Sequence, residues 1–254
     1  MADDRPGMRA GGQGRLPAGR QALVGTVTGL WRYPVKSMAA EALATAPVSW
    51  AGIAGDRRWA FVRPASGGNG FPWHTIRENP AMWTYVPRLL DPERPDKSAI
   101  EVRTPDGVTY DLTDPRLADE VGAGVRVMRL DRGLFDAMPV SLITTATASA
   151  LCGLAGVPAS ELRFRPNIVI ESATGAPYAE DTWVGSTLRV GGVAIRVDRR
   201  DSRCVTVNVN PRTGRPDGPV LKVIGQHRRT YAGVYGTTVE PGHLEVGDDV
   251  TIGP

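Results

Sequence analysis

Short runs of branched and aromatic residues, separated by turns rich in glycine and proline, constrain the fold of this chain most strongly. Two such runs, at residues 100–103 and 108–112, flank an Asp-Gly pair, which favours the tight turn of a β-hairpin. Apolar residues at helical spacing occur at residues 145–155, and residues 220–229 also suit a short helix. The sequence therefore predicts a mainly β protein with a few helices, built from β-barrels.

The length of 254 residues suits one large β-rich domain or two smaller ones. Residues 1–20 are rich in glycine and arginine and lack the apolar core of a signal peptide, so we expect a disordered tail. The weakest hydrophobic pattern after the tail lies at residues 114–124. We place the domain boundary there, which predicts a first domain at residues 21–118 and a second at residues 119–254.

Composition excludes several classes of function. The formal net charge of +3 is small, and no clustered basic face suggests a nucleic-acid partner. No run of about 18 apolar residues is present, so we expect no membrane-spanning helix. The chain has two cysteines, too few for a disulfide framework or a four-cysteine cluster, and this usage suits a reducing cytoplasm. The three histidines are too scattered to show a metal-binding spacing.

The two cysteines differ in their surroundings. Cys152 falls among the apolar positions of the predicted helix at residues 145–155, which indicates a structural role. Residues 199–210 favour a strand in which valines occupy one face and Cys204 the polar face, directly after several arginines. Nearby cationic charge lowers the pKa of a thiol. Cys204 is therefore a candidate metal ligand or nucleophile, and a buried bystander at a strand start is the alternative.

Three cationic side chains lie in segments where a ligand could bind. Pro34 cannot donate to a β-ladder, so Lys36 is expected on a loop, where a solvated surface lysine is the simpler interpretation. Arg57 begins a β-type run and shares a face with two aromatic residues, which suits either a stacked, partnered arginine or one that covers apolar surface. Residues 163–170 are predicted to be a strand with Arg165 and Asn167 on one face.

Six motifs in order resemble those of the MOSC family, the domain found at the C-terminus of molybdenum cofactor sulfurases. They are Tyr33-Pro34-Val35-Lys36-Ser37, Asp56-Arg57-Arg58-Trp59, residues 164–170, Tyr178-Ala179-Glu180-Asp181-Thr182-Trp183, Ser202-Arg203-Cys204 and residues 241–248. The closest likeness is to the branch that reduces N-hydroxylated compounds, typified by the mitochondrial amidoxime-reducing component. The resemblance implies an N-terminal β-barrel domain joined to a MOSC β-barrel, with a molybdenum cofactor (molybdopterin) between them.

The resemblance also implies roles for individual residues. Cys204 is implied to be the catalytic thiolate that ligates molybdenum. The pterin and its phosphate are implied to be held by Lys36, Ser37, Arg57, Arg165, Asn167, Ser202 and Arg203, and by a segment at residues 136–139 in which only Asp136 has a polar side chain. These residue types suit the binding of such a cofactor, because a soft thiolate binds a soft metal and the guanidinium groups of arginine bind phosphate.

The function implied is that of a molybdenum-dependent oxidoreductase, which removes oxygen from a small N–O substrate. Two cysteines cannot hold an iron–sulfur cluster, so electrons are expected from a separate ferredoxin- or flavin-type donor protein. Two alternatives stay open. One is a sulfur carrier or cofactor-handling protein that forms a persulfide on Cys204, and the other is a MOSC enzyme that acts on a different N–O substrate. The family is also associated with pyridoxal phosphate, to which we assign no residue.

Overall fold

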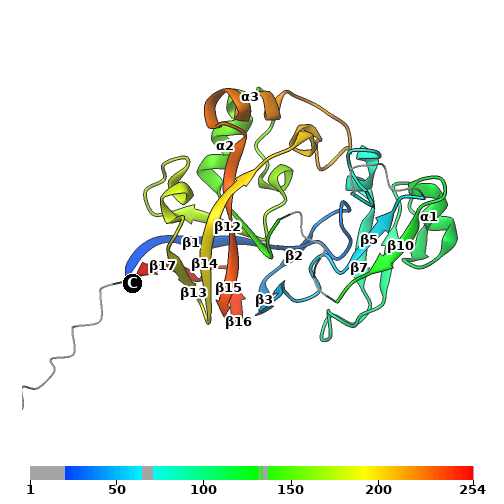
Figure 1. Ribbon diagram of the computed structural model, residues 1–254, viewed down its shortest axis with the longest axis horizontal. Coiled ribbons are helices and arrows are strands. Elements are labelled where there is room, and N and C mark those ends of the chain that lie inside the picture. Colours follow the sequence, from blue (N-terminus) through cyan, green and yellow to red (C-terminus); the bar gives the residue numbers. More distant parts are fainter. Residues whose placement is uncertain (1–20, 65–70, 132, 134–136, 254) are drawn as a thin grey trace, which may run out of the picture.

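The computed structural model describes residues 21–64, 71–131, 133 and 137–253, and Figure 1 shows its course. Strands dominate, with three α-helices and four short 3-10 helices among the described residues, so the predicted mainly β fold is confirmed. The predicted tail at residues 1–20 lies outside the described residues.

Seven strands form a closed ring in the order β12-β11-β15-β14-β13-β17-β1, and β1 closes the ring by pairing with β12. The strands are β1 (Ala22–Arg32), β11 (Val140–Thr144), β12 (Ile168–Ser172), β13 (Thr187–Val190), β14 (Val193–Ser202), β15 (Tyr231–Glu240) and β17 (Asp249–Gly253). Only the β11–β12 pair is parallel. Apolar side chains such as Leu30, Leu142 and Ile195 fill one continuous core. Closure leaves no unpaired edge in the ring, and β2 (Glu41–Leu43) extends the sheet beside the end of β1.

Shorter sheets, built mostly from the first half of the chain, lie beside the ring. Three three-stranded sheets are present, in the orders β16-β3-β4, β10-β5-β6 and β7-β8-β9. Their strands are β3 (Thr45–Ser49), β4 (Gly52–Ile53), β5 (Trp59–Val62), β6 (Trp73–His74), β7 (Val86–Leu89), β8 (Ile100–Arg103), β9 (Thr109–Asp111), β10 (Arg126–Arg129) and β16 (Gly242–Glu245). A second core, which includes Tyr33, Phe61 and Trp83, lies in this half. The pairing of β8 with β9 confirms the predicted hairpin.

Both predicted helices are present, as α2 (Thr145–Leu154) and α3 (Val220–Arg228). They contribute to a third core together with residues of β12 and η4 (Val205–Asn208). No helix among the described residues is long and apolar enough to cross a membrane.

Helix α1 (Pro115–Val121) lies in the segment that we expected to be weakly structured. The side chain of Asp114 caps it by accepting from the amide of Arg116, and proline occupies its first turn. Its buried residues Leu117 and Val121, four residues apart, pack into the second core. The Asp-Pro start was the missed signal, because the helix is too short for a clear periodic pattern.

Three strand boundaries differ from the prediction. β14 ends at Ser202, and η4 begins just after Cys204, so the expected alternation of residues 199–210 stops there. β12 begins only at Ile168, after the 3-10 helix η2 (Glu161–Phe164). β5 begins at Trp59, so Arg57 precedes the strand and does not share a strand face with Trp59 and Phe61. The remaining 3-10 helices are η1 (Pro80–Thr84) and η3 (Ala179–Trp183).

Candidate functional site

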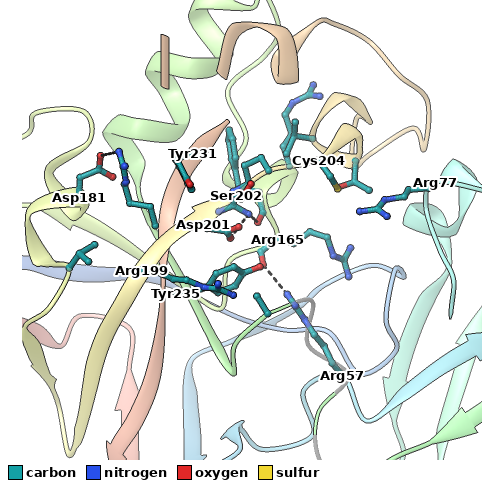
Figure 2. A pocket seen from close by; sticks show the side chains of 18 of the residues that line it. Arg57, Arg77, Arg165, Asp181, Arg199, Asp201, Ser202, Cys204, Tyr231 and Tyr235 are labelled. Carbon is teal, nitrogen blue, oxygen red and sulfur yellow. Dashed lines mark hydrogen bonds and ion pairs between the residues drawn. The ribbon is translucent and has the colours of Figure 1, made fainter. Parts of the chain in front are cut away.

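A cavity of about 650 Å³ lies between residues of the first half of the chain and the ring, and Figure 2 shows its lining. A smaller hollow adjoins it and is lined by Lys36 and Ser37, among others. Six residues line both spaces: Arg57, Phe71, Arg77, Arg165, Cys204 and Thr206. Ser202 and Arg203 line the large cavity but not the small hollow. The structure thus brings together most of the residues that the sequence singled out; Asp136 lies outside the described residues.

Cys204 lies where β14 has ended and the chain turns into η4, which leaves its side chain half-buried at the cavity wall. Its Sγ is 3.2 Å from Oγ1 of Thr206. Burial by itself raises the pKa of the thiol, but hydrogen bonds from Thr206 and Arg77, together with the positive charge of Arg77, outweigh this and lower it. The site therefore favours the thiolate, which is the form that binds metals and attacks electrophiles.

Arg77 is a residue of the candidate site that the sequence did not reveal. It lies between β6 and η1, far from Cys204 along the chain, and its guanidinium stacks over Phe71 at 5.6 Å from the ring centroid. Figure 2 shows it directed toward Cys204. We expected the arginines just before Cys204 in the sequence to supply the charge. Arg203 instead forms an ion pair with Asp201 at 2.8 Å, and Arg200 lies 3.7 Å from Asp181.

Arg57 and Arg165 are fixed around one buried aromatic ring. The guanidinium of Arg165 lies between Tyr33 and Trp83, at 4.2 and 4.3 Å from their ring centroids, and its Nη1 donates to the carbonyl of Met38 at 2.9 Å. Arg57 donates from Nη2 to the carbonyl of Arg165 at 3.1 Å. Burial raises the pKa of Tyr33, so its phenol stays protonated and donates to the carbonyl of Pro166 at 3.1 Å. These contacts hold both guanidinium groups at the cavity wall.

Three non-glycine residues at the site have left-handed backbones: Ser37 at φ 73°, Arg57 at φ 50° and Arg165 at φ 49°. Such conformations are uncommon for residues with a Cβ atom and cost about 1–3 kcal/mol each. All three residues line the small hollow. Strained backbone gathered at one place indicates a site that folding has pre-arranged for a ligand.

Arg203 is anchored by backbone carbonyls. Its Nε donates to Ala232 at 2.7 Å and its Nη1 to Phe164 at 2.6 Å. Gly233, at φ +72°, makes this possible, because a Cβ there would lie 2.6 Å from the carbonyl oxygen of Leu142 and 3.0 Å from Nη2 of Arg203. That Nη2 is buried with no hydrogen-bond partner among the described residues.

Asn167 does not line either space in the structure. Its Oδ1 accepts from the amide of Ser141 at 3.1 Å, and its Nδ2 donates to the carbonyl of Trp31 at 3.2 Å. These bonds join the residue before β12 to the neighbouring strands β11 and β1. Asn167 therefore positions the Arg165 segment, and its amide is already engaged with the backbone.

Family models match nearly the whole chain in two parts. Residues 24–138 match the model of the MOSC N-terminal beta barrel domain, and residues 130–251 match that of the MOSC domain. The chain belongs to the MOSC family. As expected from the sequence, a MOSC domain follows an N-terminal barrel domain, and the family connects this MOSC protein with the molybdenum cofactor.

Individual relatives add detail to this assignment. A molybdenum cofactor sulfurase from Solanum lycopersicum is 40% identical over 70 residues, which are 26% of this chain and only 8% of the relative. The YUAD protein from Bacillus subtilis has a similar structure, with a TM-score of 0.52 and 13% identity, over 92% of this chain and 97% of that one. This second likeness concerns the fold alone.

The residues present fit a phosphate-bearing molybdenum cofactor. The large cavity is lined by seven arginines and two aspartates, and its charge therefore favours an anionic ligand. No group of three or more histidine, cysteine or acidic side chains among the described residues is placed to hold a metal ion. A metal bound at Cys204 would thus need most of its ligands from a cofactor, which agrees with one soft thiolate beside a basic cavity.

Proposed function

We propose that this MOSC protein is a molybdenum-cofactor-dependent oxidoreductase that reduces N-hydroxylated small molecules. The observation that carries the proposal is the convergence of a thiol with a lowered pKa and a set of fixed arginines on one cavity. When bound, the cofactor supplies two-electron redox chemistry. Overall, an N–OH group with two electrons and two protons yields an N–H group and water, with the electrons coming from a separate ferredoxin- or flavin-type protein.

The roles of the chain's own residues follow from their contacts. Cys204 would ligate the metal, because its surroundings favour the thiolate. Arg57 and Arg165, stacked on Tyr33, and Lys36 in the small hollow would hold the pterin and its phosphate. Hydrogen bonds to charged groups contribute about 1.5–3 kcal/mol each, so such a set suits a retained cofactor better than a passing ligand. Ser202 and Arg203 would complete the set from the end of β14.

A second candidate is a sulfur carrier that forms a persulfide on Cys204. Two observations favour it: the thiol's lowered pKa, and the similarity of part of the chain to a protein named molybdenum cofactor sulfurase. A persulfide alone, however, gives no reason for the buried, strained Arg57 or for Lys36 beside the same cysteine. The arginine set therefore favours the oxidoreductase.

The two candidates differ in what the purified protein carries. The full chain is produced in a host that makes molybdopterin, and molybdenum is measured by elemental analysis. We expect close to one molybdenum per chain in the wild type and in Cys152→Ala, and almost none in Cys204→Ala. A metal-free wild type with sulfur that cyanide releases from Cys204 would overturn the oxidoreductase and support the carrier.

Turnover then tests the reaction. Benzamidoxime and N-hydroxylated bases are supplied with a reduced artificial electron donor, and the N–H product is measured. We expect product with the molybdenum-loaded wild type and none with Cys204→Ala. A fully loaded protein that reduces none of these compounds would contradict this substrate class and favour a MOSC enzyme that acts on a different substrate.

A further inference from the structure

The end of the large cavity away from the Lys36 hollow has its own set of side chains. Arg199, Arg200, Tyr231 and Tyr235 line the large cavity but not the small hollow, and Asp181 and Val184 accompany them. Figure 2 shows Arg199 and Asp181 on the opposite side of the site from Arg77. None of these residues belongs to the set assigned above to the cofactor.

Two irregularities in the β14–β15 ladder flank the two arginines. The register shifts between Val197 and Arg199 and again between Arg200 and Ser202. Between these shifts, Arg199 and Arg200 pair in register with Tyr235 and Val234, and both arginines line the cavity. β-Bulges redirect side chains and are frequent beside active sites. The ladder is thus distorted on both sides of two arginines that line the cavity.

The positive charge of the pair is only partly balanced. Nη1 of Arg200 is 3.7 Å from Oδ2 of Asp181, a carboxylate that also pairs with Arg228. Arg200 stacks over Tyr231, 4.4 Å from its ring centroid. The side chain of Arg199 forms no hydrogen bond or ion pair with any other described residue, and Arg199 is exposed. Of the two cations, Arg200 shares its counterion with Arg228, and Arg199 has none among the described residues. Two such cations beside two tyrosines suit a small anionic molecule with a flat body.

Exposure separates this pair from the cofactor set. The Arg200 side chain is 42% exposed, whereas that of Arg57 is 6% exposed. Buried, stacked arginines suit a group that stays bound. Hydrated arginines at the cavity wall suit one that enters and leaves, because less desolvation is needed at each exchange.

We propose that Arg199 and Arg200 bind a carboxylate or phosphate group of the substrate and hold its N–O end toward Cys204. This inference rests on the proposed function and names its substrate class as anionic N-hydroxylated compounds. The same chemistry would be satisfied by the phosphate of the cofactor, and the experiment separates the two sources.

The test uses the molybdenum-loaded full chain and two probes, benzamidoxime and 4-carboxybenzamidoxime, which differ in one carboxylate. Variants are Arg199→Met and Arg200→Met, and the control is Arg196→Met, an exposed arginine of the same strand that pairs with Asp198 and does not line the cavity. For either variant we expect the KM of the carboxylated probe to rise roughly 10-fold or more, since a charged hydrogen bond is lost. The KM of the neutral probe and the molybdenum content should stay near those of Arg196→Met.

Two results would overturn the inference. A fall in molybdenum content in Arg199→Met and Arg200→Met, but not in Arg196→Met, would assign the pair to the cofactor phosphate. Equal rises in KM for both probes would show that the two arginines do not select for the anionic group.

Binding of the probes, measured by calorimetry, keeps this test independent of turnover. If neither probe is reduced, a preference for the carboxylated probe that is lost only in Arg199→Met and Arg200→Met still supports the anion site, although the proposed reaction fails. No preference in the wild type overturns the site itself.

Discussion

The two cysteines of this chain have opposite thiol chemistry. Cys152 lies on α2 in the third core, with no solvent exposure, and burial raises the pKa of its thiol. Cys204 is half-buried at the cavity wall, and there hydrogen bonds from Thr206 and Arg77 outweigh burial and lower the pKa. Val207, three residues after Cys204, belongs to the same core as Cys152, so the two regions adjoin.

The difference shows that donors, and not depth alone, decide the ionisation of a thiol. Both thiols are desolvated, and desolvation is the largest single effect on each pKa. Only Cys204 has a guanidinium and a hydroxyl directed at its sulfur. A small region of cavity wall therefore favours the thiolate of a residue type that is usually an inert hydrophobe, and the thiolate is the form that binds metals and attacks electrophiles.

The largest expected contrast is in reactivity. In protein made without molybdopterin, iodoacetamide should alkylate Cys204 at least about 1,000-fold faster than Cys152, because Cys152 reacts only after the core opens. Peptide mass spectrometry at timed intervals measures both rates in one sample. Comparable rates in the native protein would mean that Cys152 is accessible and would remove the contrast.

Replacing Arg77 should reduce the difference in alkylation rate between Cys204 and Cys152. Arg77→Met removes a hydrogen bond and a positive charge that favour the thiolate, so the pKa of Cys204 should rise and its alkylation at pH 7 should slow about 10-fold. Arg77→Lys, which keeps the charge, should slow it less, and Arg88→Met is a control on an exposed arginine of β7. If the alkylation of Cys204 has the same pH profile in Arg77→Met and in the wild type, a role for Arg77 in lowering the pKa of Cys204 is excluded.

The free energy of unfolding should depend more on Cys152 than on Cys204. Cys152→Ala leaves a gap in a closed core and should lower the free energy of unfolding by about 1–2 kcal/mol. Cys204→Ala removes a half-buried side chain at a cavity wall, so its effect should stay within about 0.5 kcal/mol. Urea unfolding of metal-free protein measures both. A larger loss for Cys204→Ala would reverse this order.

The smallest expected effect is on the pH dependence of the unfolding free energy, to which the two cysteines should contribute with opposite signs. The raised pKa of Cys152 gives stability that is present below the ordinary thiol pKa of about 8.5 and is lost as the pH rises beyond it. The lowered pKa of Cys204 gives stability that is present above that value and is lost as the pH falls. Between pH 7 and pH 9.5, the difference in unfolding free energy from wild type should shrink for Cys152→Ala and grow for Cys204→Ala. Urea unfolding at both pH values tests this, and equal trends would contradict it.

Several local features could be predicted because neighbouring residues determine them. The helical stripe at residues 145–155 placed Cys152 in the core, and α2 confirms it. The first strand ended just before Pro34, so Lys36 lies on the predicted loop. It is buried there and lines the small hollow, so the interpretation as a solvated surface lysine was wrong. The MOSC motifs predicted the family that the family models then confirmed.

Other predictions were wrong where the backbone leaves regular strand geometry. Arg57 and Arg165 have positive φ angles, and a parity argument assumes a continuous strand through both. The interpretation of residues 199–210 as one strand was wrong for the same reason, since η4 follows Cys204. Cys204 nevertheless lines the cavity, because the chain turns there.

The sequence alone determined the β-rich class, the two longer helices and the family, and it singled out Cys204 as a candidate, since these depend on local pattern or on motifs in order. Only the tertiary structure decided that Arg77 lowers the pKa of the Cys204 thiol and that Arg199 and Arg200 line the same cavity. Contacts between segments far apart in sequence leave no periodic trace in either segment. A bulge, in turn, depends on how two strands pair, which neither strand specifies by itself.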